Sequence, residues 1–266
     1  MSLTYVVCAT PRVGSTYLCE ALGRVPGAGS PREWFGRARI HHLAGAWNLR
    51  APQSTMNEPR LTNPSAYLRR VRAEANSDGV LALKLHWNQV EWSRDNLGID
   101  PLAVLEGRQD VRFIRLYRDD LVLQTVSSYL ASVTKVFVRW AEASDPYDDE
   151  YRDAVAGTPA YDFAVLLDIL QALAVIEHGW SPFFAERDTA PYTLSYEELD
   201  DDLAGSVNGV LQYLGLPRQS VVTSPLVRQR TAVNDELAQR FRSDLLSSGV
   251  IDALPADLRR RCGVSG

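Results

Sequence analysis

Residues 3–9 read Leu-Thr-Tyr-Val-Val-Cys-Ala, and Thr-Pro-Arg-Val-Gly-Ser-Thr follows at residues 10–16. The first seven residues are mostly apolar or β-branched, which predicts a buried strand. The next seven are rich in turn residues, and Ser15 with Thr16 can cap a helix that ends near Gly23. A strand, a tight loop and a helix start form an anion site, because free backbone N–H groups and the helix dipole face the same point.

The loop at residues 10–16 does not fit the common nucleotide motifs. The NTPase loop G-x-x-x-x-G-K-[ST] needs a glycine where Ala9 stands and a lysine where Ser15 stands, and the dinucleotide motif G-x-G-x-x-G is absent too. Gly14 lets the backbone approach a ligand closely, and Arg12 adds a positive charge. We therefore predict a phosphate-binding loop that is not the ATP or NAD version. A plain turn with a capping serine is the alternative.

The rest of the chain alternates between strand and helix patterns. Short apolar runs predict three more strands, at residues 80–85, 111–117 and 190–195. Helical patterns fall at residues 64–75, 119–133, 161–187, 197–214 and 234–246. This alternation predicts an α/β fold, a single domain over residues 1–266 with a central, mostly parallel sheet flanked by helices. Residues 27–64 lack periodicity, and a loop of that length is usually functional.

Composition excludes several classes of protein. The 266 residues include 28 basic and 33 acidic ones, a net charge of −5 that argues against a general nucleic-acid binder. Apolar runs stop short of the roughly 18 residues that a membrane span needs. The start of the chain lacks a signal-peptide pattern, so we expect a cytoplasmic protein. The scattered Cys8, Cys19 and Cys262 and the lack of H-E-x-x-H predict neither a disulfide framework nor a metal site.

Arginine almost replaces lysine in this chain. Lys84 and Lys135 are the two lysines among the 28 basic residues, which leaves 26 arginines. Coding bias explains most of this excess. A lysine that persists against such a bias can mark a position where a planar guanidinium cannot replace a compact ammonium.

A second group of polar residues follows the predicted strand at 111–117. Arg118 stands at its carboxyl end, where open α/β sheets bind their ligands. Gln124 and Ser127 lie three residues apart on the next helix and share one face. A third basic cluster, Arg-Gln-Arg-Thr at residues 228–231, precedes the last helix.

Five segments together carry a resemblance to a known family. They are T-P-R-V-G-S-T at 10–16, K-L-H-W-N-Q at 84–89, R-D-D-L-V-L-Q-T-V-S at 118–127, L-S-Y-E-E-L at 194–199 and V-R-Q-R-T at 227–231. In this order they resemble the PAPS-dependent sulfotransferases, most of all the bacterial trehalose 2-sulfotransferase type, from about Tyr5 to Asp244. The resemblance implies a P-loop-like sulfotransferase fold, 3′-phosphoadenosine 5′-phosphosulfate (PAPS) as sulfuryl donor, PAP as product, and a homodimer.

The resemblance also implies which residues bind the donor. The 5′-phosphosulfate would be held by Arg12, Gly14, Ser15 and Thr16. The 3′-phosphate would be held by Arg118 and Ser127, with Arg228 closing over it and Tyr196 near the adenine. The spacing from Arg118 to Ser127 is nine, as in the bacterial type, and Gln124 and Ser128 are rivals of Ser127 for this contact. Val13 stands where the family's Arg-Ser-Gly-Ser loop has a serine.

Sulfuryl transfer needs in-line positioning, a base for the hydroxyl and positive charge at the leaving phosphate. Arg12 and Lys84 are the candidate cations. Glu33 aligns with the carboxylate proposed as base in the trehalose enzymes, and we expect the apolar wall beside it, Trp34 and Phe35, to raise its pKa toward neutrality. His86 matches the K-x-H of the animal cytosolic enzymes, so both candidates for the base stay open.

The acceptor is predicted as a small molecule with a hydroxyl group, on a sugar, a glycolipid or a natural product. Glu33 and Trp87 are the candidate acceptor contacts, with the indole as a stacking surface, and residues 27–64 are the expected acceptor-binding region. The family's Gly-Glu-Pro-Gln-Glu becomes Gly-Ser-Pro-Arg-Glu at 29–33. Two alternatives stay open: a nucleotide-binding, kinase-like enzyme, and a protein that binds PAP without catalysis.

Overall fold

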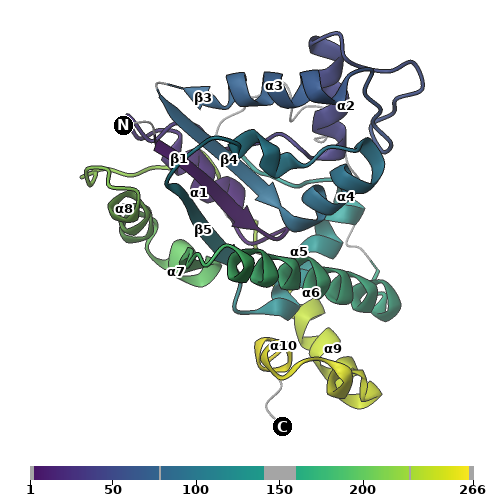
Figure 1. Cartoon of the computed structure of the whole chain (residues 1–266). Helices are drawn as coiled ribbons and strands as arrows, with labels where there is room; N and C mark the ends of the chain where they lie inside the picture. The colour runs from purple at the N-terminus through teal and green to yellow at the C-terminus, as the bar shows by residue number, and fades with distance from the viewer. Residues whose placement is uncertain (1–2, 78, 141–159, 228, 264–266) are drawn as a thin grey trace.

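The computed structural model describes residues 3–77, 79–140, 160–227 and 229–263. These residues form a six-stranded sheet in the order β2-β4-β1-β5-β6, with β3 paired to β4 (Figure 1). The strands are β1 (Leu3–Ala9), β2 (Arg32–Glu33), β3 (Asn76–Ser77), β4 (Val80–His86), β5 (Val111–Tyr117) and β6 (Tyr192–Ser195). The β3–β4 pairing is antiparallel and the others are parallel. The predicted α/β fold with a mostly parallel sheet is confirmed.

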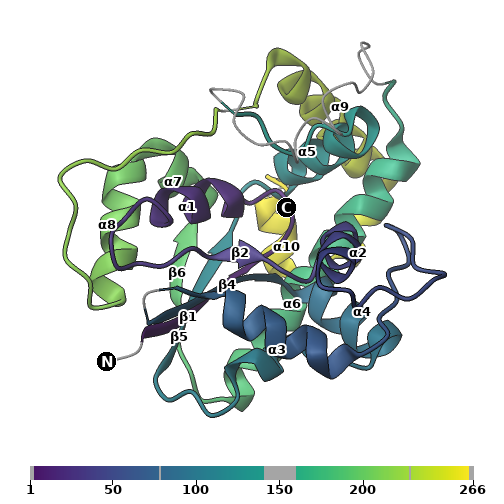
Figure 2. The same ribbon diagram turned by 90° about the horizontal axis from the view of Figure 1, so that it is seen from above.

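Helices cover both faces of the sheet. They are α1 (Ser15–Leu22), α2 (Arg37–Ala46), α3 (Pro64–Glu74), α4 (Trp87–Leu97), α5 (Leu121–Thr134), α6 (Phe163–Glu186), α7 (Tyr196–Asp201), α8 (Leu203–Tyr213), α9 (Ala232–Ser248) and α10 (Ala256–Arg261), with 3-10 turns η1 (Pro101–Leu105) and η3 (Val250–Ala253). Figure 2 shows α1 and α8 on one side of the sheet and α3 and α4 on the other.

The central strand β1 shows how the sequence produces these two layers. Successive side chains of a strand point to opposite faces of the sheet. Tyr5, Val7 and Ala9 accordingly enter the core cluster that includes residues of α1 and α8. Val6 and Cys8 enter the cluster formed with α2, α3, α4 and the end of α6. A strand buried on both faces needs a continuous apolar run, which is what residues 5–9 provide.

Helix α6 is the longest helix of the described residues, and by length and composition alone it could cross a membrane, with a mean hydropathy of 1.4 over 18 residues. Within the fold, 28% of that window is buried. Leu166, Leu170 and Leu173 pack in a third core cluster with α5, α9 and α10. Trp180 donates from its indole Nε1 to the carbonyl of Ala9 at 3.0 Å, so α6 also anchors the end of β1.

Two regions differ from the prediction. The single helix predicted at residues 197–214 is two helices, because Asp202 leaves helical geometry at φ −135° and its carboxylate caps α8 by accepting from the Gly205 N–H at 2.8 Å. The region 27–64 is not all irregular, since it contains β2 and α2. Helix α2 buries two residues, Ile40 and Ala44. Two buried positions are too few to give the apolar stripe that predicts an amphipathic helix.

Candidate active site

The candidate residues gather because the sheet brings strand ends together. Five strands run parallel, so their carboxyl ends lie at one edge of the sheet. In sheet order this edge carries Glu33 on β2, Lys84 and His86 on β4, the loop from Arg12 to Gly14 after β1, Arg118 after β5 and Tyr196 after β6. Neighbouring strands lie about 4.8 Å apart, so this row spans roughly 19 Å from β2 to β6.

The loop after β1 brings bare backbone to this edge. Helix α1 begins at Ser15, and its N-cap is Gly14, in the left-handed region at φ 75° with no side-chain cap. The expected capping by Ser15 and Thr16 is therefore wrong. A Cβ at Gly14 would lie 2.8 Å from Cδ2 of Tyr196, so glycine is required by both conformation and contact. The first N–H groups of α1 thus remain available to an anion.

Arg12 ties the loop to distant parts of the chain. Its φ is 68°, unusual for a residue with a side chain. Its Nε donates to Ser127 Oγ at 3.0 Å, one terminal nitrogen donates to Gln229 Oε1 at 2.8 Å, and the other donates to the carbonyl of Phe137. These acceptors are all neutral, so hydrogen bonds hold the guanidinium in place while its charge stays uncompensated by them.

Arg118 lies beside this loop and is almost fully buried, at 6% exposure. Its guanidinium stacks over the ring of Tyr196 at 4.4 Å from the centroid and donates to the carbonyl of Arg12 at 3.5 Å. Its Nε forms an ion pair with Oε1 of Glu197 at 3.7 Å, and this Nε has no hydrogen-bond partner among the described residues. A buried nitrogen with an unmet hydrogen bond is a natural contact for a ligand oxygen.

Burial and a neighbouring guanidinium destabilise the charge of Arg12. Burial, followed by repulsion from Arg118, lowers the pKa of Arg12 to about 10. Burial also lowers the pKa of Arg118. With a pKa of about 10 Arg12 stays charged at neutral pH, and an anion beside it would relieve the repulsion from Arg118.

The three α5 residues predicted as rival contacts of the 3′-phosphate have different partners in the structure. Gln124 is fully buried and donates from its Nε2 to Thr10 Oγ1 and to the Pro11 carbonyl, both at 2.8 Å. Ser128 donates to the carbonyl of Gln124 at 3.0 Å. Ser127 is the residue that meets Arg12. Gln124 therefore supports the loop, while Ser127 contacts Arg12; the phosphate contact itself stays a prediction.

Arg228, the third predicted arginine of the donor site, lies outside the described residues. Its neighbours are described on both sides. Gln229 accepts from Arg12, as noted above, and Arg230 pairs with Asp235 at the start of α9, its Nε lying 2.9 Å from Oδ1. The segment before α9 therefore reaches the loop after β1.

Lys84 and Glu33 form an ion pair at the other end of the row. Lys84 Nζ lies 2.8 Å from Glu33 Oε2, and it donates to Thr16 Oγ1 at 3.2 Å. The Lys84 side chain is 8% exposed and that of Glu33 is 31% exposed. The pair forms because β2 lies next to β4 with Glu33 in register with Lys84. Gln89, on α4, donates from its Nε2 to Glu33 Oε1 at 2.7 Å.

This pairing overturns the expected pKa of Glu33. Burial raises the pKa of a carboxyl group, but the attraction of Lys84 and His86 and the hydrogen bonds from Lys84 and Gln89 outweigh it, and the pKa falls to about 2. The sequence prediction of a raised pKa was wrong. Trp34 and Phe35 do not form a wall around the carboxylate, since both are buried in the core cluster with α2 and α3. Glu33 is thus a firmly ionised carboxylate in the free protein.

His86, the rival base, is neutral at pH 7. Burial, which here outweighs the attraction of Glu33, lowers its pKa to about 4. Its Nε2 is buried and has no hydrogen-bond partner within the described ranges. Its backbone N–H donates to Gln89 Oε1 at 3.3 Å, so one glutamine holds both candidate bases. Gln89 was not predicted as a site residue, although the K-L-H-W-N-Q segment contains it.

Trp87, the predicted stacking surface, packs against α6. Its ring centroid lies 5.1 Å from that of Trp180 and 5.9 Å from that of Phe183. A Cβ at Gly179 would lie 2.0 Å from the Trp87 ring, so the indole rests directly on that glycine. Trp87 is partly buried in this cluster, and its contact with an acceptor stays a prediction.

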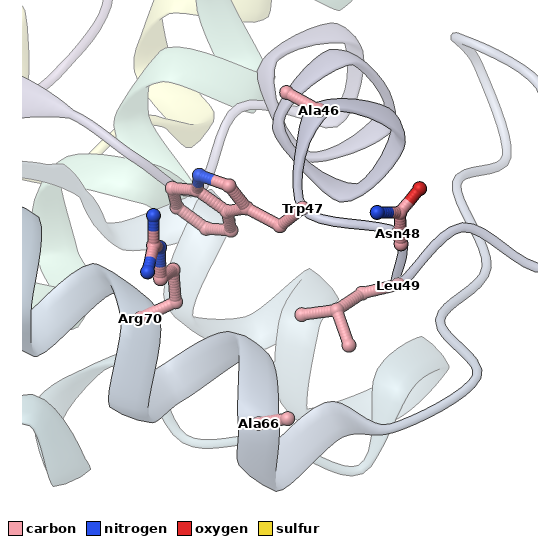
Figure 3. Close-up of a pocket in the computed structure, with 6 residues that line it drawn as sticks. All are labelled: Ala46, Trp47, Asn48, Leu49, Ala66 and Arg70. Carbon is pink, nitrogen blue, oxygen red and sulfur yellow. The ribbon is translucent and has the colours of Figure 1, made fainter.

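The region 27–64 also contributes to a cavity, of about 390 Å³, between the end of α2 and α3 (Figure 3). Its lining residues are Ala46, Trp47, Asn48, Leu49, Ala66 and Arg70. The Arg70 guanidinium lies 5.8 Å from the centroid of the Trp47 ring. That ring also stacks on Trp34, at 6.4 Å between centroids, so the cavity wall is continuous with the residue next to Glu33.

No group of three or more His, Cys, Asp or Glu residues that could hold a metal ion occurs among residues 3–77, 79–140, 160–227 and 229–263. The absence of a metal in the reaction stays a prediction.

Comparison with known proteins identifies the family. The family model of the Stf0 sulphotransferases matches residues 4–244. The trehalose 2-sulfotransferase of Mycobacterium tuberculosis (strain ATCC 35801 / TMC 107 / Erdman) is 29% identical over 262 residues, which cover 90% of this chain and 94% of that protein. The trehalose 2-sulfotransferase of Mycolicibacterium smegmatis is 26% identical over 268 residues, covering 92% and 97%.

Solved structures give more distant matches. A sulfotransferase from Alicyclobacillus acidocaldarius aligns with a TM-score of 0.45 at 14% identity, over 96% of this chain and 98% of that one. The mouse sulfotransferase SULT7A1 complexed with PAP aligns with a TM-score of 0.39 at 13% identity, over 91% of this chain and 65% of that one.

The ion pair of Glu33 and Lys84 predicts a measurable effect on stability. Glu33→Gln leaves a buried ammonium without its carboxylate and should lower the free energy of unfolding by roughly 1–3 kcal/mol at pH 7, less than for a fully buried pair because the Glu33 side chain is 31% exposed. A carboxyl group whose pKa is about 2 in the folded state and about 4.3 in the unfolded state stabilises the fold above pH 4.3. That contribution is lost as the pH falls toward 2. Urea denaturation of both proteins should therefore show a difference that shrinks below pH 4.3.

Glu74 provides the control for this measurement, because it pairs with Arg70 on the exposed surface of α3 at 3.2 Å. Glu74→Gln should change the free energy of unfolding by about 0.5 kcal/mol or less. Equal effects of the two substitutions would contradict the assigned role of the buried pair.

Proposed function

The chain belongs to the Stf0 sulphotransferase family and is a sulfotransferase; on this premise we propose that it transfers a sulfuryl group from PAPS to a hydroxyl of a sugar. The observation that carries the proposal is the row of cations at the carboxyl edge of the sheet. Arg12 is held by neutral acceptors and Arg118 has an unbonded buried Nε. Such a site favours a ligand with several negative charges.

The spacing of these cations supports a nucleotide with phosphate groups at both ends. The loop after β1 and Lys84 on β4 would hold the 5′-phosphosulfate through Arg12, Gly14, Ser15 and Thr16. Arg118 and Ser127, with Arg228, would hold the 3′-phosphate, and Tyr196, stacked under Arg118, would lie near the adenine.

The proposed reaction is a single in-line displacement. The acceptor hydroxyl oxygen forms a bond to sulfur as the bond from sulfur to the bridging phosphate oxygen breaks, so PAP leaves with that electron pair. The hydroxyl proton goes to a base on the enzyme. Lys84 and Arg12 would stabilise the charge that develops on the leaving oxygen. Both lie next to the start of α1, where the bridging oxygen would sit in this proposal.

Glu33 is our first choice for the base, and His86 is the second. The Glu33 side chain is 31% exposed, so an acceptor can reach it, whereas Nε2 of His86 is buried. The low pKa of Glu33 results largely from Lys84. When the ammonium of Lys84 pairs with the donor in place of Glu33, the pKa of Glu33 should rise. A higher pKa would make the carboxylate a better base. The ion pair would then link donor binding to activation of the acceptor.

The acceptor is proposed as a sugar because both curated relatives are named trehalose 2-sulfotransferases. Residues 27–64 would bind it, with Glu33 at the reacting hydroxyl and Trp87 beside the ring. Ser30 and Arg32, where the family has acidic and neutral residues, favour a sugar other than trehalose; a glycolipid or a natural product would present the same hydroxyl. The single domain, the homodimer and the cytoplasmic location stay predictions.

Donor binding and transfer test this proposal directly. Calorimetric titration should show that PAP binds with a dissociation constant in the micromolar range and that ATP with Mg²⁺ binds at least tenfold more weakly. Incubation with ³⁵S-labelled PAPS and a panel of trehalose, other disaccharides and glycolipids should label at least one sugar. Tighter binding of ATP with Mg²⁺ would favour the kinase-like alternative. PAP binding without transfer to any acceptor of the panel, or of a cell extract, would favour a PAP-binding protein without catalysis.

The identity of the base is tested by two matched substitutions. Glu33→Gln should lower kcat by 10²–10⁴-fold, the usual contribution of a general base, and should leave the dissociation constant of PAP within about threefold. His86→Gln should keep kcat within about tenfold of the wild type. Single-turnover rates with saturating PAPS separate the chemical step from binding. Full activity of Glu33→Gln together with loss of activity in His86→Gln would make His86 the base.

The shape of the cation at position 84 is the next prediction. Lys84 contacts both Glu33 and Thr16 from a nearly buried position, and the broader guanidinium of arginine would not fit the same two contacts. Lys84→Arg should lower kcat about 10–100-fold and change the dissociation constant of PAP by less than about threefold. Lys135→Arg, the same change at an exposed position that ends α5, is the control. Equal kcat values for both variants would contradict a catalytic role of the ammonium.

A further inference from the structure

The last described segment of the chain contacts the donor site that is proposed above. The family model ends at residue 244, within α9, so η3 and α10 lie beyond the part of the chain that it matches. Figure 1 shows α10 beside α9 at the end of the chain. Leu258 and Cys262 are buried in the core cluster that α5, α6 and α9 form, so α10 is packed into the fold. Its position is therefore fixed by apolar contacts.

Arg261, at the end of α10, binds the main chain of the donor site. Its Nε donates to the carbonyl of Arg118 at 3.0 Å, and one terminal nitrogen donates to the same oxygen. The other terminal nitrogen lies 2.7 Å from Oε1 of Glu177, a buried carboxylate on α6. The Arg261 side chain is 16% exposed. The planar fork thus joins α10, α6 and the end of β5 in one contact, which an ammonium cannot reproduce.

A second arginine from the C-terminal part of the chain, Arg242, binds Asp120, which lies two residues after Arg118. Arg242, on α9, lies 2.5 Å from Asp120 Oδ2 and donates from its Nε to the carbonyl of Cys262 at 3.2 Å. Asp120 caps α5 by accepting from the Leu123 N–H at 2.8 Å. The turn at 118–120 is therefore held from the C-terminal side at its first and last residues.

The opposite side of this turn is held by Glu197 of α7. Its carboxylate accepts from the N–H of Asp119 at 2.9 Å and from the N–H of Asp120 at 3.3 Å. The main chain of the turn is thus fixed on two sides, while the guanidinium of Arg118 is left with an unbonded Nε. A binding site gains affinity when its groups are held in place before the ligand arrives.

We propose that Arg261 is a positioning residue for the donor: it fixes the main chain of Arg118, so that affinity for a 3′-phosphate depends on α10, outside the family's matched region. The inference rests on the proposed function, in which Arg118 contacts the 3′-phosphate. It assigns α10 a role in donor recognition without any contact of α10 with the nucleotide.

Arg261→Gln in the full chain tests the inference. Calorimetry should show that the dissociation constant of PAP rises about tenfold, while that of adenosine 5′-monophosphate, which lacks the 3′-phosphate, changes less than about twofold. Arg118→Ala should give the same selective loss. Arg260→Gln, on the same helix with an exposed side chain, should leave both constants unchanged. Arg261→Lys, which can bind either the carbonyl or Glu177, should give an intermediate value.

A second readout does not depend on a nucleotide. Hydrogen exchange of the amides at 119–123 in the free protein should be faster in Arg261→Gln than in the wild type and in Arg260→Gln. Unchanged PAP affinity or unchanged exchange in Arg261→Gln would overturn the inference. Equal losses for PAP and adenosine 5′-monophosphate would overturn it too, because they would indicate general damage to the fold. Failure of the wild type to bind PAP would instead contradict the proposed function. Calorimetry of the wild type alone distinguishes this outcome from failure of the inference about Arg261.

Discussion

The candidate site depends on one constraint, the parallel pairing of five strands of the sheet. Segments as distant as Arg12 and Tyr196 reach one edge of the sheet because their strands run in the same direction and end there. The strand order puts β1 in the middle, with Glu33 on one side of its loop and Arg118 on the other. A long ligand that lies along this edge would meet all of these residues in sheet order. The sheet therefore sets both the order and the spacing of the candidate site residues.

The electrostatic character of the edge differs from that of the whole chain. The protein carries a net charge of −5, but Arg12, Arg118 and Lys84 are concentrated at one place. Arg12 is oriented by neutral acceptors and Arg118 by an aromatic ring and a carbonyl. The contacts of Arg12 fix its geometry without neutralising its charge, which suits a binding site for an anion. Arg118 has the carboxylate of Glu197 at 3.7 Å from its Nε, and Glu33 neutralises Lys84 until another anion competes.

The sequence predicted the four longer strands but not the two-residue strands β2 and β3. Residues 3–9 and 111–117 form strands with the predicted bounds, because a strand buried on both faces is apolar along its whole length. Helix α2 was missed, since it buries few residues, and α4 and α10 were not predicted either. The break at Asp202 depends on a side chain that caps the helix after it, and aspartate is common enough inside helices to conceal this.

Contacts between distant segments mark the limit of prediction at the site. Lys84 and His86 stand two residues apart on β4 and so share one face of the sheet, but no local pattern reveals that β2 pairs beside them. Glu33 was therefore judged by its sequence neighbours Trp34 and Phe35, which turn into the core, and the direction of its pKa shift was predicted wrongly.

The residue type at position 84, in contrast, agrees with its contacts to other segments of the chain. In a chain with 26 arginines, Lys84 has its ammonium between a carboxylate and a hydroxyl on two other segments, whereas the other lysine, Lys135, is exposed. The guanidinium of Arg261 bridges α10, α6 and the residue after β5, because its several nitrogens donate to the Arg118 carbonyl and to Glu177 together. At position 84 a single ammonium meets both Glu33 and Thr16, at 2.8 and 3.2 Å. Each cation thus has contacts that match its shape, a planar fork at Arg261 and a compact ammonium at Lys84.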